Sequence, residues 1–185
     1  PCYTVGGDFY DFIPLPDNNI GLVVADVSGK GVPASLIMAS VRAALRAHVD
    51  NVYYLYEVLR RVNLMLFRDT KPEEFVTLFY GVLDTLGGRL TYVNAGHPSP
   101  MLVSRESVER LSVGGTVIGP LPEVRFKRGL ALLPRDACLV MCTDGILERR
   151  NPADEFYGEI RLIDTVRRNL GRPAQDILAA VFKEC

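Results

Sequence analysis

The order in which apolar periodicity changes along the chain constrains the fold most. Residues 5–13, 20–25, 75–83 and 89–94 have the pattern of strands, the last two joined as a hairpin. Helical stripes are expected at 33–48 and 53–68, shorter strands at 100–103, 108–111, 123–132 and 137–143, and two closing helices at 159–169 and 173–183. Strands therefore group with strands and helices with helices. This order favours an α+β fold with antiparallel sheets over a doubly wound parallel sheet.

Length, charge and hydropathy narrow the class of protein. The 185 residues are 48% hydrophobic, which is enough for a real core, and we expect residues 1–185 to form a single domain. The formal net charge of −1 gives no general attraction for nucleic acid. No apolar run approaches the roughly 18 residues that a membrane span needs. We therefore expect neither a nucleic-acid partner nor a membrane span in this segment.

The cysteine pattern argues against a zinc site. The four cysteines form no Cys-x-x-Cys motif, and the chain has only two histidines. Cys138 and Cys142 lie in an apolar run, so we expect buried thiols rather than a disulfide. Nothing indicates an oxidising compartment or a signal peptide, and we expect a cytoplasmic protein. The chain begins and stops abruptly, so we expect a domain that is truncated at both ends and lacks its final strand.

Two segments place a carboxylate after an apolar strand. Residues 21–25 precede Asp26, and residues 138–143 precede Asp144; glycines follow in both cases. A carboxylate at the rim of a buried strand is held rigidly without being buried unpaired, and nearby glycines let a ligand approach the backbone. The alternative is that each Asp opens a turn or caps a helix, since Asp favours both positions.

A third candidate carboxylate lies near the N-terminus. Asp8 and Asp11 are three residues apart, so a regular strand points them to opposite faces, and we favour Asp8 because it follows two glycines. Asp84 also ends an apolar strand, but the hairpin after it explains it. Carboxylates with a backbone carbonyl and water form a hard oxygen site that suits Mg²⁺ or Mn²⁺. Two such ions would clamp a phosphoryl group.

Four motifs in a fixed order carry a resemblance to a known family. They are Gly-Gly-Asp-Phe-Tyr-Asp-Phe at 6–12, Ala-Asp-Val-Ser-Gly-Lys-Gly-Val-Pro-Ala at 25–34, Asn-Ala-Gly-His-Pro at 94–98 and Thr-Asp-Gly-Ile at 143–146. The chain resembles the SpoIIE-like branch of the metal-dependent (PPM, phosphatase 2C-like) serine/threonine protein phosphatases. The resemblance extends from residue 5 to about residue 183, and the ordered set is more specific than any one motif.

The resemblance implies a fold and a set of metal ligands. The fold is a four-layer α/β/β/α sandwich of two antiparallel sheets flanked by helices, with a site for two Mn²⁺ or Mg²⁺ ions at one edge. Asp26 would bridge both ions, the Val27 carbonyl would bind one of them and Asp144 the other. Asp8 would act on metal-bound water or as an outer ligand. The hydroxide activated by the two metals would attack phosphorus directly.

The resemblance also implies partners. The substrate would be a phosphoserine or phosphothreonine on a bacterial regulatory protein, an anti-anti-sigma factor in this branch. Such domains often form the output of a sensor protein, so we expect an upstream sensor domain, and the helices after the Gly-Lys-Gly loop imply contacts in a homodimer. The alternative function is a non-catalytic module on the same fold that binds phosphoproteins or dimerises.

The sequence departs from the family at two points. Family members normally end with another strand that carries a further metal carboxylate, and Asp154, Asp164 and Asp176 do not match that motif, so one metal site is expected to be weak or empty. Ser28 stands where eukaryotic-type members carry a histidine that serves as general acid. His97, in a Gly-His-Pro turn, is expected to be structural rather than a proton donor.

Overall fold

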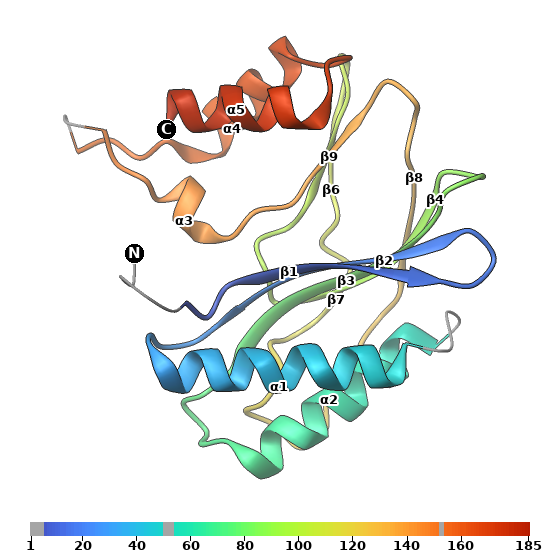
Figure 1. Ribbon diagram of the computed structural model, residues 1–185, viewed down its shortest axis with the longest axis vertical. Helices are drawn as coiled ribbons and strands as arrows, with labels where there is room; N and C mark the ends of the chain where they lie inside the picture. Colours follow the sequence, from blue (N-terminus) through green and yellow to red (C-terminus); the bar gives the residue numbers. More distant parts are fainter. Residues whose placement is uncertain (1–5, 50–53, 152–153) are drawn as a thin grey trace. The chain divides into compact units, whose positions relative to one another are not determined.

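The structure, a computed structural model, describes residues 6–49, 54–151 and 154–185. The chain divides into two compact units, one formed by Pro1–Ser99 with Leu111–Leu132 and the other by Pro100–Arg110 with Leu133–Cys185 (Figure 1). The chain thus passes twice from the first unit to the second. The expectation of a single domain stays a prediction.

The first unit contains six strands and two helices among its described residues. The strands are β1 (Phe9–Leu15), β2 (Asn19–Val27), β3 (Val76–Asp84), β4 (Arg89–Ala95), β7 (Gly114–Gly115) and β8 (Gly129–Leu132), and the helices are α1 (Val32–His48) and α2 (Leu55–Asp69). The sheet order is β1-β2-β3-β4-β7, and β8 also pairs with β4. All pairings are antiparallel except the two-residue pairing of β4 with β7. The α+β prediction is therefore confirmed, with one short parallel exception.

Two details of this sheet differ from the expectation. The strand predicted at 123–132 covers only Gly129–Leu132, because the Lys127 amide donates to the Gly114 carbonyl instead of joining a ladder with β4. Strand β7 was not predicted, since glycine is a poor strand former. Gly114 has a packing reason to be glycine: a Cβ there would lie 1.8 Å from the Asn94 carbonyl oxygen.

Strand β2 lies inside the sheet of the first unit, next to the edge strand β1. It pairs with β1 on one side and β3 on the other, and residues 21–25 are buried, as the apolar run predicts. Val23, Ala25 and Val27 belong to the hydrophobic core beneath the helices. Because side chains alternate along a strand, Asp26 belongs to the opposite face of the sheet.

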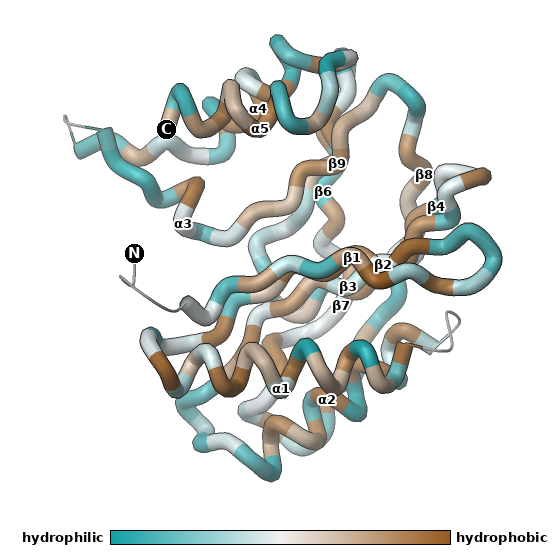
Figure 2. The backbone as a smooth tube through the Cα atoms, in the orientation of Figure 1, coloured by the Kyte–Doolittle hydropathy of each residue, from teal (hydrophilic) through white to brown (hydrophobic). Residues whose placement is uncertain are grey.

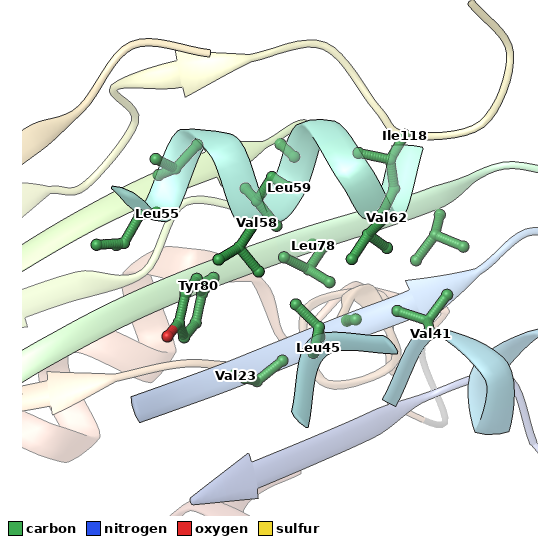
Figure 3. Packing of buried hydrophobic residues seen from close by; sticks show 14 of the residues in the cluster. Val23, Val41, Leu45, Leu55, Val58, Leu59, Val62, Leu78, Tyr80 and Ile118 are labelled. Atoms are coloured by element: carbon green, nitrogen blue, oxygen red, sulfur yellow. The ribbon is translucent and has the colours of Figure 1, made fainter. Parts of the chain in front are cut away.

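The core of the first unit lies between the sheet and the two helices. Figure 3 shows Val41 and Leu45 of α1 and Val58 and Val62 of α2 packing toward Leu78 of β3. Helix α1 carries a proline in its first turn, as expected.

Leu36, which we expected on the buried stripe of α1, is 65% exposed. Nine residues separate Leu36 from the buried Leu45, and at 100° a residue this places the two on opposite sides of the helix. Apolar and polar residues alternate along α1 in Figure 2.

An ion-pair cluster fastens the edge strand β1 to α1. Arg46 donates to both carboxylate oxygens of Asp11, at 2.7 and 2.8 Å, and Arg42 donates to one of them at 3.0 Å. The Asp11 side chain is only 10% exposed. The hydrogen bond from Arg46 is the main cause that lowers the pKa of Asp11 below its usual range. Asp11 therefore serves the packing of β1 on the helix-covered face.

The second unit is a smaller sheet with helices. Its strands are β5 (Met101–Val103), β6 (Val108–Arg110) and β9 (Cys138–Val140), in the order β6-β5-β9 and all antiparallel, and its helices are α3 (Asp144–Leu147), α4 (Gly158–Arg168) and α5 (Ala174–Glu184). Met101, Leu162, Val166 and Val181 are among the residues of its core. The two long helices match the prediction, whereas the short α3 was not predicted.

The three cysteines that the structure describes are free thiols. Cys138 and Cys142 pack against the core of the second unit, and burial is the main cause that raises the pKa of Cys142 to about 11. The Cys142 thiol therefore stays protonated at neutral pH. The expectation of thiols rather than a disulfide is confirmed for these two positions, although they are half-buried rather than fully buried, while Cys2 lies outside the described residues.

No helix in the described part of the chain has both the length and the apolar character that crossing a membrane requires.

The Asp11 cluster generates a prediction about stability. We expect Asp11→Asn to lower the free energy of unfolding at pH 7 by about 1 kcal/mol, a modest value because the arginines are half exposed and solvent screens them. The folded-state pKa of Asp11 is lowered, so its contribution is present above the ordinary carboxyl pKa and is lost as the pH falls through the lower folded value. The difference between the proteins should shrink below about pH 4.

Urea unfolding curves of the two proteins between pH 7 and pH 3 would measure this effect. Asp17→Asn is a matched control, because Asp17 is exposed in the β1–β2 turn and its left-handed backbone also suits asparagine. Equal stability of wild type and Asp11→Asn at pH 7 would contradict the role assigned to the cluster.

Candidate functional site

Strand register places two of the predicted site carboxylates together. Phe9 pairs with Ala25, so the preceding Asp8 lies across from Asp26 at the same end of the sheet. Phe9 and Ala25 both pack on the helix-side core, and alternation therefore assigns Asp8 and Asp26 to the other face. Asp11 belongs to the helix side, where Arg42 and Arg46 bind it. The sequence-based preference for Asp8 over Asp11 agrees with this arrangement.

The Val27 carbonyl is approached closely by the N-terminal segment. Gly7 is buried, and a Cβ on Gly7 would lie 2.8 Å from the Val27 carbonyl oxygen and 3.2 Å from its Cβ. Only glycine fits there without a shift of backbone. The Ser35 hydroxyl lies 3.1 Å from the Gly6 carbonyl oxygen and 3.0 Å from that of Gly31, which ties this segment to the start of α1. Glycine is therefore required where the chain passes the end of β2.

Ser28 fixes the residue after the predicted metal-binding carbonyl. Its amide donates to the Phe75 carbonyl at 2.8 Å, and its hydroxyl accepts from the Phe75 amide at 2.8 Å. The same hydroxyl donates to the Glu73 carbonyl at 3.1 Å. Ser28 thus uses its hydroxyl to join β2 to the segment before β3.

The Asn-Ala-Gly-His motif forms a buried turn at the same end of the sheet. The Asn94 side chain donates to the His97 carbonyl at 3.0 Å and accepts from the His97 amide at 2.8 Å. The His97 Nδ1 lies 2.8 Å from the Thr77 hydroxyl. His97 is 4% exposed and lies within this hydrogen-bonded turn, while its expected structural role stays a prediction. Thr77, which pairs directly with Asp26, was not singled out from the sequence.

Asp144 belongs to the second unit and differs from Asp26 in its setting. It is exposed and is the first residue of α3, and its carbonyl accepts the Glu148 amide at 2.8 Å. The prediction that Asp144 ends a rigid buried strand was wrong: β9 stops at Val140 and is only half-buried. Val140 pairs with Met101, so the next pair would need Pro100, which has no amide hydrogen to donate. The alternative that this Asp opens a helix is the one observed.

The first unit offers oxygen donors of the kind that a hard divalent cation prefers. They are the Asp8 and Asp26 carboxylates and the Val27 carbonyl, beside Gly7, where a Cβ would crowd that carbonyl oxygen. This donor set fits Mg²⁺ or Mn²⁺. Within residues 6–49, 54–151 and 154–185, however, no three His, Cys, Asp or Glu side chains form a group that could hold a metal ion. The roles of Asp8, Asp26, Val27 and Asp144 as ligands therefore stay a prediction.

Comparisons with known proteins agree with the fold and the motifs. Residues 16–185 match the family described as Stage II sporulation protein E (SpoIIE). The chain is 30% identical to Protein IcfG of Synechocystis over 91% of its length and 27% identical to Phosphoserine phosphatase RsbU of Bacillus subtilis over 98%. These matches cover 31% of IcfG and 54% of RsbU, so the chain spans about half or less of each curated relative.

Solved structures give the same result. The RsbU and RsbW domains of Rv1364c from Mycobacterium tuberculosis match with a TM-score of 0.82 and 27% identity, over 97% of this chain and 50% of that one. RsbX, solved in complex with magnesium, matches with a TM-score of 0.73 and 16% identity, over 98% and 81% of the two chains, which shows the fold alone. The architecture is that of the PP2C-type phosphatase domains. The chain belongs to the SpoIIE family, and the predicted branch is confirmed.

The contact between Gly7 and Val27 generates a second prediction. We expect Gly7→Ala to destabilise the protein by about 1–3 kcal/mol, because the new methyl group would meet backbone atoms that cannot move aside cheaply. Gly6→Ala is the matched control: its Cβ would meet nothing closer than the Asp8 amide at 3.9 Å. Chemical unfolding of the two variants measures the difference. Equal loss in both variants would show that the close approach is not what requires glycine at position 7.

Proposed function

We propose that the chain is the catalytic domain of a divalent-metal-dependent serine/threonine protein phosphatase. The observation that carries the proposal is the convergence of Asp8, Asp26 and the Val27 carbonyl at one end of one sheet. Membership of the SpoIIE family and the resemblance to a relative named as a phosphoserine phosphatase support the reaction type. The substrate we propose is phosphoserine or phosphothreonine on a bacterial regulatory protein, an anti-anti-sigma factor.

Each proposed ligand has a distinct structural support. Asp26 lies on β2, which pairs with β1 on one side and with β3 on the other, so the backbone that carries its carboxylate belongs to a strand held by two neighbours. The Val27 carbonyl is held between the Gly7 contact and the Ser28 hydrogen bonds. Asp8 follows Gly7 on the same face as Asp26. Asp144, the first residue of α3, is proposed as a ligand on its motif alone.

When bound, Mn²⁺ or Mg²⁺ would supply a nucleophile from water near neutral pH and would neutralise charge on the phosphoryl oxygens. The residues of the chain would bind the cations and orient the water that attacks. Asp26 and the Val27 carbonyl would fix the cations against the sheet, and Asp8 would accept or hold a proton of the water that attacks. Ser28 would donate no proton to the leaving group, because its hydroxyl hydrogen is used by the Glu73 carbonyl.

The non-catalytic module remains the second candidate function. One observation favours it: within the described residues no cluster of three metal-binding side chains is formed. Such a module would bind a phosphorylated protein without releasing phosphate. An upstream sensor domain and a homodimer are proposals as well. Because the matched relatives are longer than this chain, the experiment uses the natural full-length protein.

Phosphate release by the natural full-length protein tests the proposal. The substrate would be a phosphoserine protein of the anti-anti-sigma type, with Mn²⁺ added. We expect Asp26→Asn to lower kcat by at least about a hundredfold, because the cations would lose the carboxylate that bridges them. Asp144→Asn should also reduce release, and a chelator should abolish it until Mn²⁺ is restored.

Asp84→Asn is the matched control for this experiment. Asp84 also lies at a strand end, but at the far end of β3, where its carboxylate accepts the Leu86 and Gly87 amides of a turn. The activity of Asp84→Asn should stay close to that of the wild type. The wild type could instead bind the phosphoprotein saturably and release phosphate neither from it nor from an aryl phosphate. That result would favour the non-catalytic binding module over the enzyme. Release that persists in Asp26→Asn would refute the assignment of the site.

A further inference from the structure

One buried titratable side chain has no part in the proposed reaction. His97 is 4% exposed, as is Asn94, and both lie at the end of the sheet that carries Asp26. Buried polar groups are costly unless they are hydrogen-bonded, so such a pair at this position needs a physical reason. The described residues contain no buried side-chain nitrogen or oxygen that lacks a partner.

Hydrogen bonds of Asn94 and His97 hold the turn in place and connect it to Thr77. The Asn94 side chain forms hydrogen bonds with both the backbone N–H and the backbone carbonyl of His97. It also donates to the Leu111 carbonyl at 3.3 Å. The backbone of His97 is therefore fixed, and its imidazole is fixed with it. Gly96 has a φ of +72°, which permits the tight turn that aims the ring. The imidazole Nδ1 then lies 2.8 Å from the Thr77 hydroxyl.

Thr77 connects this turn to the site. Thr77 and Asp26 are direct partners in the antiparallel pairing of β2 and β3, so their side chains share one face of the sheet, with Cβ atoms about 4.5–5.5 Å apart. The Thr77 hydroxyl is also 3.5 Å from the Asp26 carbonyl oxygen. Whichever atom of the Thr77–His97 pair donates, the hydroxyl cannot rotate freely beside Asp26.

We infer that His97 is a positioning residue for the cation site and acts through Thr77. The imidazole fixes the Thr77 hydroxyl, which restrains the end of β2 where Asp26 and the Val27 carbonyl face the cation. Ser28 restrains the next peptide of β2, between Val27 and Ser28, through the Phe75 backbone on the same side of the strand as Thr77. The inference rests on the proposed function, because it assigns a support to ligands that remain proposed. Groups of this kind that orient metal ligands typically change metal affinity or activity by 10–100-fold.

Direct Mn²⁺ binding by the natural full-length protein, measured by calorimetry without substrate, tests the inference. Thr77→Val keeps the shape of the side chain and removes the hydroxyl; we expect it to weaken Mn²⁺ binding about tenfold. Thr77→Ser keeps the hydroxyl and should stay within about twofold of the wild type. His97→Leu should match Thr77→Val, while His97→Asn, whose amide can replace the Nδ1 contact, should recover most of the affinity.

A purely structural role predicts a different result. In that case the melting temperature of Thr77→Val would fall while Mn²⁺ affinity stayed at the wild-type value. Thr91→Val is the matched control, since Thr91 is a half-buried threonine of the same sheet, on β4 and on the helix side. It should show a similar small change in melting temperature and no change in Mn²⁺ affinity. Steady-state kinetics should place the effect of Thr77→Val in the Mn²⁺ activation constant, with KM for the phosphoprotein unchanged.

Asp26→Asn separates this inference from the proposed function. If Asp26→Asn loses Mn²⁺ binding while folded Thr77→Val and His97→Leu bind Mn²⁺ as the wild type does, the positioning role is refuted and the proposed site stands. If Asp26→Asn binds Mn²⁺ unchanged, the proposed site and the inference both fail. Loss of affinity in Thr77→Val with rescue in Thr77→Ser supports the role of the hydroxyl.

Discussion

The pairing of β2 with β3 is the constraint on which the rest of the first unit depends. It runs in one register from Asn19 opposite Asp84 to Val27 opposite Val76. A slip of one residue would turn every side chain of β2 to the other face, so that Asp26 would enter the apolar core and Val23 would leave it. Burying Val23, Ala25 and Val27 beneath the helices therefore also fixes the face and the end of the sheet at which Asp26 lies.

Much of this arrangement can be read from local sequence. The run from Ile20 to Ala25 is apolar at every position except glycine, which predicts a strand buried on both faces, and a strand of that kind has to end in a polar residue at the rim. Alternation alone also separates Asp8 from Asp11. The structure shows what Asp11 does instead: its carboxylate accepts hydrogen bonds from Arg42 and Arg46, which lie one turn apart on α1.

Asp144 shows where local sequence is insufficient. The six residues before it are as apolar as those before Asp26, yet only Cys138–Val140 form a strand. The limit is set by Pro100 on the neighbouring strand segment, nearly forty positions away, and no periodicity within 138–144 encodes it. The Thr77–His97 contact was missed for the same reason. It joins two strand ends through a turn, and the only sequence signal was that a polar Asn-Ala-Gly-His motif follows an apolar strand.

Asp26 and Asp144, two of the proposed ligands, are held in place in different ways. The end of β2 at Asp26 and Val27 is held from two segments, by Phe75 and Thr77 on one and by Gly7 on the other, so a shift of the strand end would break hydrogen bonds and close contacts together. Asp144 begins a helix of four residues, which is too short to be stable by its own hydrogen bonds and depends on its packing within the second unit. Of the proposed ligands, Asp26 is therefore preorganised within its own unit, whereas Asp144 is adjustable within its own. The bridging role suits the preorganised one, because a carboxylate shared by two cations has to satisfy two coordination geometries at once, and that is the role proposed for Asp26.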